Sequence, residues 1–399
     1  MAAGTTAMAA PQQGTSAAPA SAQQRARPFC QASFFGVEQG TTFSGTLSTA
    51  QQTYQPTPLP ATGYLRRVRL ETVFTGGTAG TAVTGVGFPF NHLNLVRFCE
   101  PNAAPVLELT GYYLYLADVF GGYAGWDDPA QMWDYAGTAP NVNMTPYVPV
   151  ELDMTGMGAL SNLSNASAFR LTMILENGAT GGPLYTTQPT TLPTFTIVPH
   201  VDYWSLPNPY DQAGQAQATA PPYPGTIQLW SQIQNITLNV GNNRTSLNRM
   251  GNQLRTVIMA TKAAGIYSET PFPNPAQFRW DDINLRIESP QSLRTWMREF
   301  IVTTQGRTAT GGLPGFTGIY CYPYSSGITR EVGGNGISSL LPTVTATRYE
   351  LSGASAGAGV LDWVINDVSS APVSGVQRAT VGGGLGYYPP APAAQVPST

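Results

Sequence analysis

The segment from Phe278 to Tyr324 constrains the fold most strongly, because it reads as a strand, a capped helix and a second strand in succession. From Asp282 to Glu288 apolar and polar residues alternate. A period of two is typical of a strand with one buried face. We therefore predict that Ile283, Leu285 and Ile287 lie on the buried side of this strand.

Ser289 and Pro290 end this strand and are typical of a helix start. The serine hydroxyl can cap the first turn, and proline at the first helical position loses no needed N–H. Apolar residues then recur at i, i+3, i+4, i+7 and i+8, which predicts a helix with one apolar stripe. They are Leu293, Trp296, Met297, Phe300 and Ile301. The aromatic-rich run from Phe316 to Tyr324 favours another strand.

Turn-forming residues are spread along the whole chain, with 43 Gly and 34 Pro among 399 residues. Frequent turns leave little room for long helices, so we expect a mainly β fold. Only 10% of the residues are charged, against about 25% in a typical soluble protein. Because burying an unpaired charge is costly, a charge-poor surface is suited to being covered by neighbouring subunits. The net charge of -3 gives no field that attracts nucleic acid.

Further strands and short helices are predicted from local patterns. Strands are expected from Tyr64 on (with Val68, Leu70 and Phe74 buried) and at Phe88–Phe98, Val106–Phe120, Tyr147–Met154, Phe169–Glu176, Phe195–Trp204, Ile227–Val240, Pro342–Leu351 and Val360–Val368. Helices are expected from Asp127 through Trp133, weakly at Ala159–Ala168, and at Thr245–Gln253. Leu254–Ala260 fits either a continued helix or a strand, and a helical turn followed by a strand is preferred.

The two halves of the chain echo one another, which predicts two β-sandwiches of similar length. Leu93-Asn94-Leu95 and Ile283-Asn284-Leu285 each follow a Phe-Pro pair in a strand that ends at a proline. Asn208–Pro224 has no periodicity and reads as the linker. The predicted units are an N-terminal arm and lead-in (1–59), a first sandwich (60–207), a linker (208–225), a second sandwich (226–370) and a C-terminal tail (371–399).

The first 28 residues contain no large apolar side chain apart from methionine, so a flexible arm is expected. Its only charges are Arg25 and Arg27, and the first acid is Glu38. An ordinary frayed terminus is the alternative interpretation. Three aromatic residues follow and should dock the arm on an apolar surface: Phe29, Phe34 and Phe35. Neither a signal peptide nor an apolar run of about 18 residues is found, so no membrane span is expected.

Side chains suited to catalysis or metal binding are scarce. The two histidines, His92 and His200, are far apart in strand-like runs, and structural roles are expected for both. Cys30, Cys99 and Cys321 match no metal or redox spacing and are expected to be small buried hydrophobes. We therefore predict no catalytic, cofactor or metal site.

A carbohydrate-binding or carbohydrate-cleaving β-sandwich protein is the alternative function. Glycoside hydrolysis needs two facing carboxylates, and the candidates are Asp127-Asp128 and Asp281-Asp282. The first pair is better explained as a cap before Pro129 and the second as the entry to a strand, where adjacent side chains point to opposite faces. An enzyme is therefore not expected.

In order and local signature the sequence resembles the double jelly-roll major capsid proteins of tailless icosahedral phages, most closely the tectivirus-like phages with an internal membrane. In the first half the resemblance lies in YLRRVRLETVF, in FNHLNLVRF leading to LELTGYYLYLADVF, and in FRLTMILENG before FTIVPHVDYWSLP. In the second half it lies in RMGNQLRTVIMATKAAG and in the strand–helix–strand segment. It spans about residues 60 to 370.

The resemblance implies two eight-stranded antiparallel jelly-roll β-sandwiches side by side in one chain, with short flanking helices. Three chains would form a pseudo-hexagonal homotrimer, and trimers would tile an icosahedral virion shell together with penton and minor capsid proteins. The protein would be assembled in the host cytoplasm. The arm residues Arg25, Arg27, Phe29, Phe34 and Phe35 would lie at the inner surface, on an internal membrane or on neighbouring subunits. No sequence-specific nucleic acid and no cofactor is implied.

Overall fold

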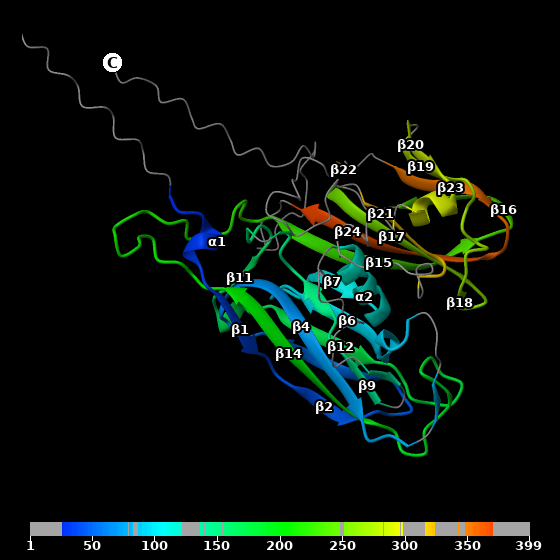
Figure 1. The fold of residues 1–399 in the computed structure, drawn as a ribbon, viewed down its shortest axis with the longest axis horizontal. Helices are drawn as coiled ribbons and strands as arrows, with labels where there is room; N and C mark the ends of the chain where they lie inside the picture. Colours follow the sequence, from blue (N-terminus) through cyan, green and yellow to red (C-terminus); the bar gives the residue numbers. More distant parts are fainter. Residues whose placement is uncertain are drawn as a thin grey trace, which may run out of the picture.

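Two layered β-sandwiches lie side by side in the computed structural model (Figure 1). The structure describes residues 26–78, 80–82, 87–121, 136–138, 141–153, 155–247, 251–281, 283–295, 297, 316–323, 341–342 and 348–369. Within these ranges no helix is long and apolar enough to span a membrane.

One sheet of eight strands is formed by the first half of the chain alone. Its main path is β1 (Phe35–Gln39), β14 (Thr194–Trp204), β4 (Gly63–Thr75), β9 (Asn141–Met144) and β8 (Ala136–Thr138). The remaining strands are β2 (Phe43–Thr46), which pairs with β14, and β10 (Tyr147–Pro149) and β11 (Leu160–Asn162), which pair with β4. A separate ribbon joins β5 (Thr81–Ala82) to β13 (Tyr185–Thr187).

A second sheet, of ten strands, runs through both halves. Its path is β18 (Ile266–Tyr267), β17 (Gln253–Ala263), β24 (Gly359–Ser369), β15 (Ile227–Leu238), β7 (Pro105–Leu109), β6 (Leu93–Cys99), β12 (Arg170–Leu175) and β3 (Gln52–Pro58), with β21 (Ile319–Pro323) and β22 (Leu341–Pro342) paired to β17. The halves meet where β15 pairs with β7 in parallel, through Trp230 opposite Leu107 and Ser231 opposite Glu108.

The second half closes its sandwich with a four-stranded sheet in the order β16 (Gly241–Leu247), β23 (Tyr349–Ser355), β19 (Ala276–Trp280) and β20 (Ile283–Glu288). Packing between the layers is direct, since the ring centroids of Tyr349 on β23 and Trp363 on β24 are 6.3 Å apart. In the second half one sheet has the strand order β15-β24-β17-β21 and the facing sheet has the order β16-β23-β19-β20. The chain passes from one sheet to the other several times. This alternation gives the second half the strand order of a jelly roll.

Helices are few among the described residues. They are α1 (Phe29–Ala32), α2 (Gly111–Phe120), the short 3-10 turns η1 (Phe90–His92) and η2 (Asn165–Ser167), and the helical residues 290–295 and 297. The backbone N–H of Ser292 donates to the Ser289 hydroxyl at 3.0 Å, so the predicted cap is confirmed.

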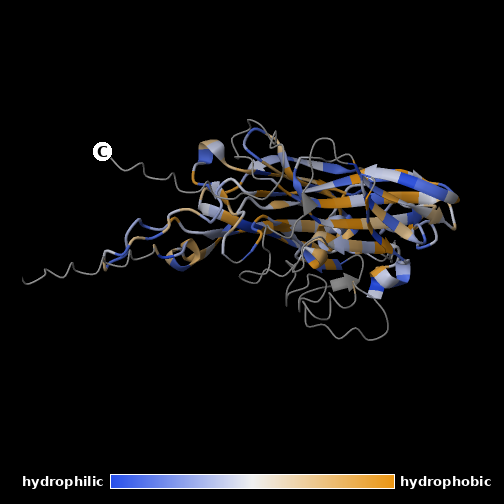
Figure 2. Ribbon diagram, turned by 90° about the horizontal axis from the view of Figure 1, so that it is seen from above, coloured by the Kyte–Doolittle hydropathy of each residue, from blue (hydrophilic) through white to orange (hydrophobic). Residues whose placement is uncertain are grey.

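Buried apolar side chains form one large core that extends through both sandwiches. Figure 2 shows hydrophobic segments along the strands between the layers. Val68, Leu70 and Phe74 on β4 are fully buried, as their alternation predicts. The prediction of a mainly β protein built from jelly-roll sandwiches is confirmed.

The predicted strand at Val106–Phe120 is wrong in its second part. Residues up to Leu109 form β7, but Gly111–Phe120 forms the helix α2. All ten residues of α2 are buried. A helix buried on every side has no polar face, so its sequence lacks the helical period and its aromatic residues favoured a strand.

The helix predicted at Thr245–Gln253 is also wrong. Its start lies in β16 and its last residue begins β17, which is strand throughout Leu254–Ala260. Pairing with β23 and β24, more than 90 residues later in the chain, overrides the local preference. The weak helix at Ala159–Ala168 is instead β11 followed by η2. The helix predicted from Asp127 through Trp133 lies outside the described residues.

The predicted unit boundaries remain proposals. Strands β1, β2 and β3 precede residue 60 and pair with the first-half strands β14 and β12. If strand pairing defines the units, the first sandwich begins before Phe35 and not after Leu59.

Candidate assembly surfaces

The lead-in segment is attached to the first sandwich by α1 and β1. Phe29 on α1 is 3% exposed, and its ring lies 5.3 Å from that of Tyr64 and 6.2 Å from that of Trp204. Strand β1 then pairs along β14 from Phe35 to Gln39. The chain is thus fixed on the sandwich from Phe29 onward.

The ion pair of Arg66 and Glu151 lies next to this attachment. Arg66 on β4 binds the buried Glu151 carboxylate with two nitrogens, the shortest contact being 2.7 Å. The indole N–H of Trp204 donates to the same carboxylate at 2.9 Å. The Arg66 guanidinium carbon also lies 4.4 Å from the Trp204 ring centroid and 4.9 Å from that of Phe35. Such a doubly bonded, stacked arginine is rigid.

Apolar side chains remain exposed around this attachment. Phe34 is 66% and Phe35 48% exposed. The loop between the halves, residues 205–226, lies at the same end of the molecule (Figure 1). It is joined to the lead-in segment there, where the Arg27 N–H donates to Ala216 O at 2.9 Å. We call the following exposed set the base surface: Arg27, Phe34, Phe35, Leu206, Tyr210 and Tyr223.

The predicted arm residues are therefore placed unequally. Phe29 packs against the first sandwich, while Phe34 and Phe35 present much of their surface to solvent. Arg27 is exposed, and its backbone pairs with the loop between the halves. Arg25 lies outside the described residues.

A second exposed apolar set lies on β20, which is an edge strand. Ile283 and Ile287 are 66% and 55% exposed, so the prediction that they are buried is wrong. The alternating pattern identified the strand correctly, but it could not tell whether another layer covers it. An exposed edge strand with apolar side chains is a template for association with another chain.

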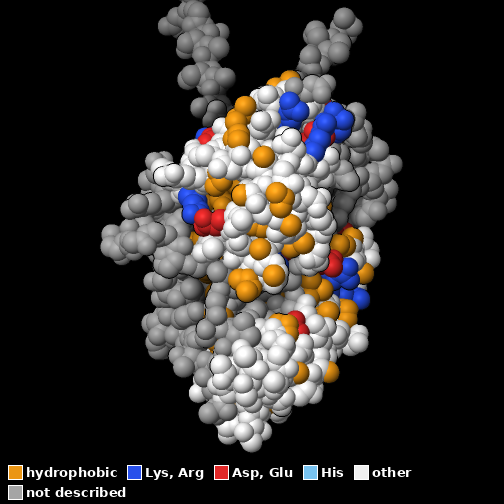
Figure 3. Space-filling view, turned by 90° about the vertical axis from the view of Figure 1, so that its right-hand side faces the viewer, with side chains coloured by type: hydrophobic (Ala, Val, Ile, Leu, Met, Phe, Trp, Pro, Cys, Tyr) orange, Lys and Arg blue, Asp and Glu red, His pale blue; other side chains and the backbone are white. Residues whose placement is uncertain are grey.

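Charges on the outer faces of the sheets are largely paired. Arg67 and Arg69 hold the buried Asp202 at 2.7 and 3.0 Å. His200 lies 2.7 Å from Glu71. Figure 3 shows the end of the molecule where β16 and β18 lie, and it carries scattered hydrophobic side chains and few charged ones. A surface of this kind can be covered at low desolvation cost.

A buried polar cluster joins the halves, and it was not predicted from the sequence. Asp362 on β24 is fully buried and lies 2.7 Å from Lys262 Nζ. Its carboxylate also accepts a hydrogen bond from the Tyr113 hydroxyl on α2 and another, at 2.7 Å, from the backbone N–H of Asn235. Tyr113 and Asp362 are 249 residues apart. Nothing local in either segment could have revealed the contact.

Arg255 makes a second link. Although only 1% exposed, it donates to Asn366 Oδ1 at 3.2 Å and to Gly121 O, at the end of α2, at 3.1 Å. Buried polar contacts of this kind are costly to break, because each leaves a group without its partner. The two sandwiches are thus held in a fixed relation.

The residues considered for chemistry are mostly isolated. His92 is buried against Phe74 and Phe88, and its Nδ1 lies 2.8 Å from Pro89 O. Burial lowers the His92 pKa to about 4. In the part of the chain that the structure describes, no three His, Cys, Asp or Glu side chains are placed to hold a metal ion.

The cysteines and the acid pairs complete this picture. Cys99 and Cys321 are buried and Cys30 is partly buried, and all three are free thiols. Asp281 lies in a turn, where it accepts the Arg348 N–H at 2.7 Å. Its neighbour Asp282 and the pair Asp127-Asp128 fall outside the described residues.

Comparisons with solved structures define the fold class. Three similar structures are the MCP of Sulfolobus turreted icosahedral virus, the major capsid protein P2 of bacteriophage PM2 and the PBCV-1 virus capsid. Their TM-scores are 0.54, 0.51 and 0.51, at 11%, 9% and 12% sequence identity. Each alignment covers 84% of this chain, and 96%, 97% and 94% of the other.

By sequence, no protein-family model matches and no curated protein matches. The structural likeness therefore shows the fold: the chain has the double jelly-roll fold of viral major capsid proteins. The resemblance stated from the sequence is confirmed at this level.

Proposed function

We propose that this chain is a major capsid protein that forms the shell of an icosahedral virion. Fold alone does not fix function, because one fold can host several. The observation that carries the proposal is the rigid union of two sandwiches in one chain through β7, β15 and α2. Three such chains supply six similar blocks, enough for a pseudo-hexagonal tile.

The proposed tile is a homotrimer with head-to-tail contacts that close into a ring. Each copy would contribute the edge strand β20 of its second half, where Ile283 and Ile287 are exposed. The paired charges of the outer faces support this role, because few unpaired charges would be buried on contact. Contacts with penton and minor capsid proteins would use the trimer rim.

The base surface is proposed to face the inside of the shell and an internal membrane. Its aromatic side chains suit a membrane–water boundary, where amphipathic rings collect. The cations Arg25 and Arg27 would add about 1 kcal/mol each at an anionic surface, so binding would depend on many copies acting together. We propose no catalytic role.

Two measurements on the purified full-length chain test these proposals. Light scattering after size-exclusion chromatography should give three times the mass of the chain, and negative-stain images should show hexagonal outlines. A monomer at tens of micromolar would refute the trimer. A closed particle hides the inward-facing base surface, so free trimers are tested: their pelleting with phosphatidylserine vesicles, but not with phosphatidylcholine vesicles, would support the membrane contact, and equal recovery in the supernatant would contradict it.

A further inference from the structure

The strands of the two sandwiches correspond one to one, and this correspondence leaves two strand edges unmatched. The path β1-β14-β4-β9 of the first half corresponds to β15-β24-β17-β21 of the second, and β7-β6-β12-β3 corresponds to β20-β19-β23-β16. Inside the chain β7 pairs with β15 in parallel. Their counterparts β20 and β1 each pair, among the described strands, on one side only. They lie on opposite sides of the molecule (Figure 1), so one chain cannot bring them together.

Equivalent residues at the paired and the unpaired edges differ in exposure. Leu109, the fifth residue of β7, is fully buried, whereas Ile287, the fifth residue of β20, is 55% exposed. Leu229, the third residue of β15, is 1% exposed, whereas Val37, the third residue of β1, is 45% exposed. Apolar side chains on an unpaired strand edge favour pairing with another chain. The two exposed edges therefore lack the cover that the internal joint gives to their counterparts.

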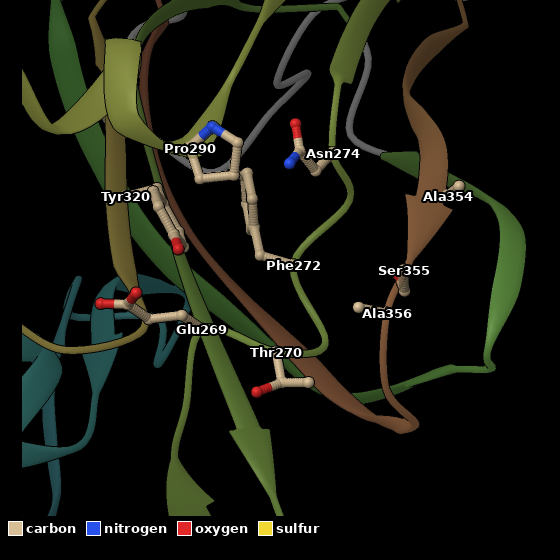
Figure 4. A pocket seen from close by; sticks show the side chains of 9 residues that line it. All are labelled: Glu269, Thr270, Phe272, Asn274, Pro290, Tyr320, Ala354, Ser355 and Ala356. Carbon is tan, nitrogen blue, oxygen red and sulfur yellow. The ribbon is translucent and has the colours of Figure 1, made fainter.

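The helices that follow β7 and β20 differ in the same way. Helix α2, one residue after β7, is buried along its whole length. The second helix, one residue after β20, is covered on one side by its own sandwich, where its first residue Pro290 lies beside Phe272 and Tyr320 (Figure 4). Its other side presents uncharged polar residues to solvent: Gln291, Ser292 and Thr295. A neutral surface of this kind can be covered by a partner at low desolvation cost.

The strands β1 and β15 begin at equivalent positions. Phe35, the first residue of β1, lies opposite Trp204, the last residue of β14. Ile227, the first residue of β15, lies opposite Ser369, the last residue of β24. The strands β1 and β2 together run over residues 35–46, and β15 runs over residues 227–238, twelve residues in each half. Positions counted from the start of β1 and of β15 can therefore be equated.

The strands β7 and β20 also begin at equivalent positions. Pro105, the first residue of β7, lies opposite Cys99, the last residue of β6. Ile283, the first residue of β20, lies opposite Trp280, the last residue of β19. The register of the joint between β7 and β15 can therefore be transferred to β20 and β1.

We infer that β20 of one copy pairs in parallel with β1 of the next copy, so that the contact between chains repeats the joint within the chain. In the internal joint Ser231, the fifth residue of β15, lies opposite Glu108, the fourth residue of β7. The equivalent residues between copies are Gln39 and Arg286. Arg286 would then lie close to Glu38, the only charged residue of β1 and β2. This inference rests on the proposed trimer and names the two surfaces that form its contact.

Cross-linking of the purified full-length chain tests the register. Cys99 and Cys321 are buried, so Cys30→Ser provides a background without a partly exposed thiol. In that background Gln39→Cys and Arg286→Cys together should give covalent trimers with a short bifunctional maleimide, seen on a denaturing gel. The matched control combines Gln39→Cys with Asn242→Cys. Asn242 is exposed on β16, at the opposite edge of the sheet that contains β20, so this pair should stay uncross-linked.

Light scattering tests the β1 edge separately. Val37→Asp with Gln39→Asp places two further negative charges beside Glu38 and should reduce the mass from three chains to one. The control Val240→Asp, at a side chain that is 69% exposed in the turn after β15, should leave the trimer intact. Circular dichroism checks that each variant is folded, and the cross-linking result decides if the double variant is not.

The outcomes separate this inference from the proposed shell function. A parent protein that is monomeric would refute the trimer and this contact together. A trimeric parent in which Gln39→Cys and Arg286→Cys cross-link no more than the control pair would overturn the contact alone. Trimers that persist in a folded Val37→Asp and Gln39→Asp variant would do the same.

Discussion

The buried cluster at Asp362 gives the sharpest test of how the two sandwiches are joined. Replacing Asp362 by Asn keeps the size of the side chain but removes its charge. Lys262 then has no carboxylate partner, although its side chain is 21% exposed and can be partly hydrated. Breaking a buried ion pair costs about 3–5 kcal/mol. Because Lys262 retains some access to water, we expect the low end, about 3 kcal/mol.

This loss converts into a measurable shift in melting temperature. Unfolding entropy is about 2.1 cal/mol/K per residue, or about 0.8 kcal/mol/K for a chain of 399 residues. The expected decrease is therefore about 4 °C by calorimetry. Replacing Lys262 by Met in the same chain should recover part of the loss, since no unpaired charge then remains.

The control is the exposed pair of Arg97 and Glu108, which are 3.0 Å apart with side chains 42% and 35% exposed. Glu108→Gln should change the free energy of unfolding by at most about 1 kcal/mol, or about 1 °C. If Asp362→Asn and Glu108→Gln shift the melting temperature equally, the cluster does not fix the two sandwiches and the reasoning is refuted.

Four further outcomes are expected. Burial lowers the His92 pKa from 6.5 to about 4, so the unfolded state binds the proton at a higher pH than the folded state does. The free energy of unfolding should therefore decrease by up to about 3 kcal/mol as the pH falls from 6.5 to 4. His92→Gln should flatten that decrease. Replacing Ile283 and Ile287 together by Asp should yield folded monomers in light scattering. Deleting residues 1–27 should leave trimers intact and reduce particle yield. Ser289→Ala should cost about 1 kcal/mol in chemical unfolding, and Ser289→Asp should cost much less.

Each expectation has a contradicting result. An unchanged pH profile for His92→Gln would remove the buried neutral imidazole as a cause of acid sensitivity. Trimers that persist with both Asp substitutions would place the contact elsewhere than β20. Normal particle yield without residues 1–27 would remove the assembly role of the arm. An equal loss for Ser289→Ala and Ser289→Asp would show that the side-chain cap is unimportant.

Local patterns identified the strands whose two faces differ. Strand β4 alternates between core and surface, and its buried residues follow the predicted phase from Val68 to Phe74. The cap at Ser289 was equally visible, because it depends on residues three apart. The attachment of Phe29 fitted the expectation of an aromatic anchor, whereas the exposure of Phe34 depends on what the rest of the chain leaves uncovered.

The contacts that hold the two halves together could not be predicted from local sequence patterns. Helix α2 has no polar face, so its ten buried residues carry no helical period. Asp362 and Arg255 are buried and contact Tyr113 on α2 and Gly121 at its end, and no pattern in their own strands predicted these contacts. The loop between β18 and β19 likewise meets the turn after β23 through Thr270 and Gly357, which are about 90 residues apart.

The sequence by itself determined the β character, the duplication into two sandwiches and a surface poor in charge. The β character and the duplication follow from local sequence patterns, and the charge-poor surface follows from composition, which is a sum over all residues. Tertiary structure alone decided that β20 stays uncovered, that α2 is a helix and that Asp362 meets Lys262 and Tyr113. The physical reason is that burial depends on which distant segment packs against a residue, and no local pattern contains that information.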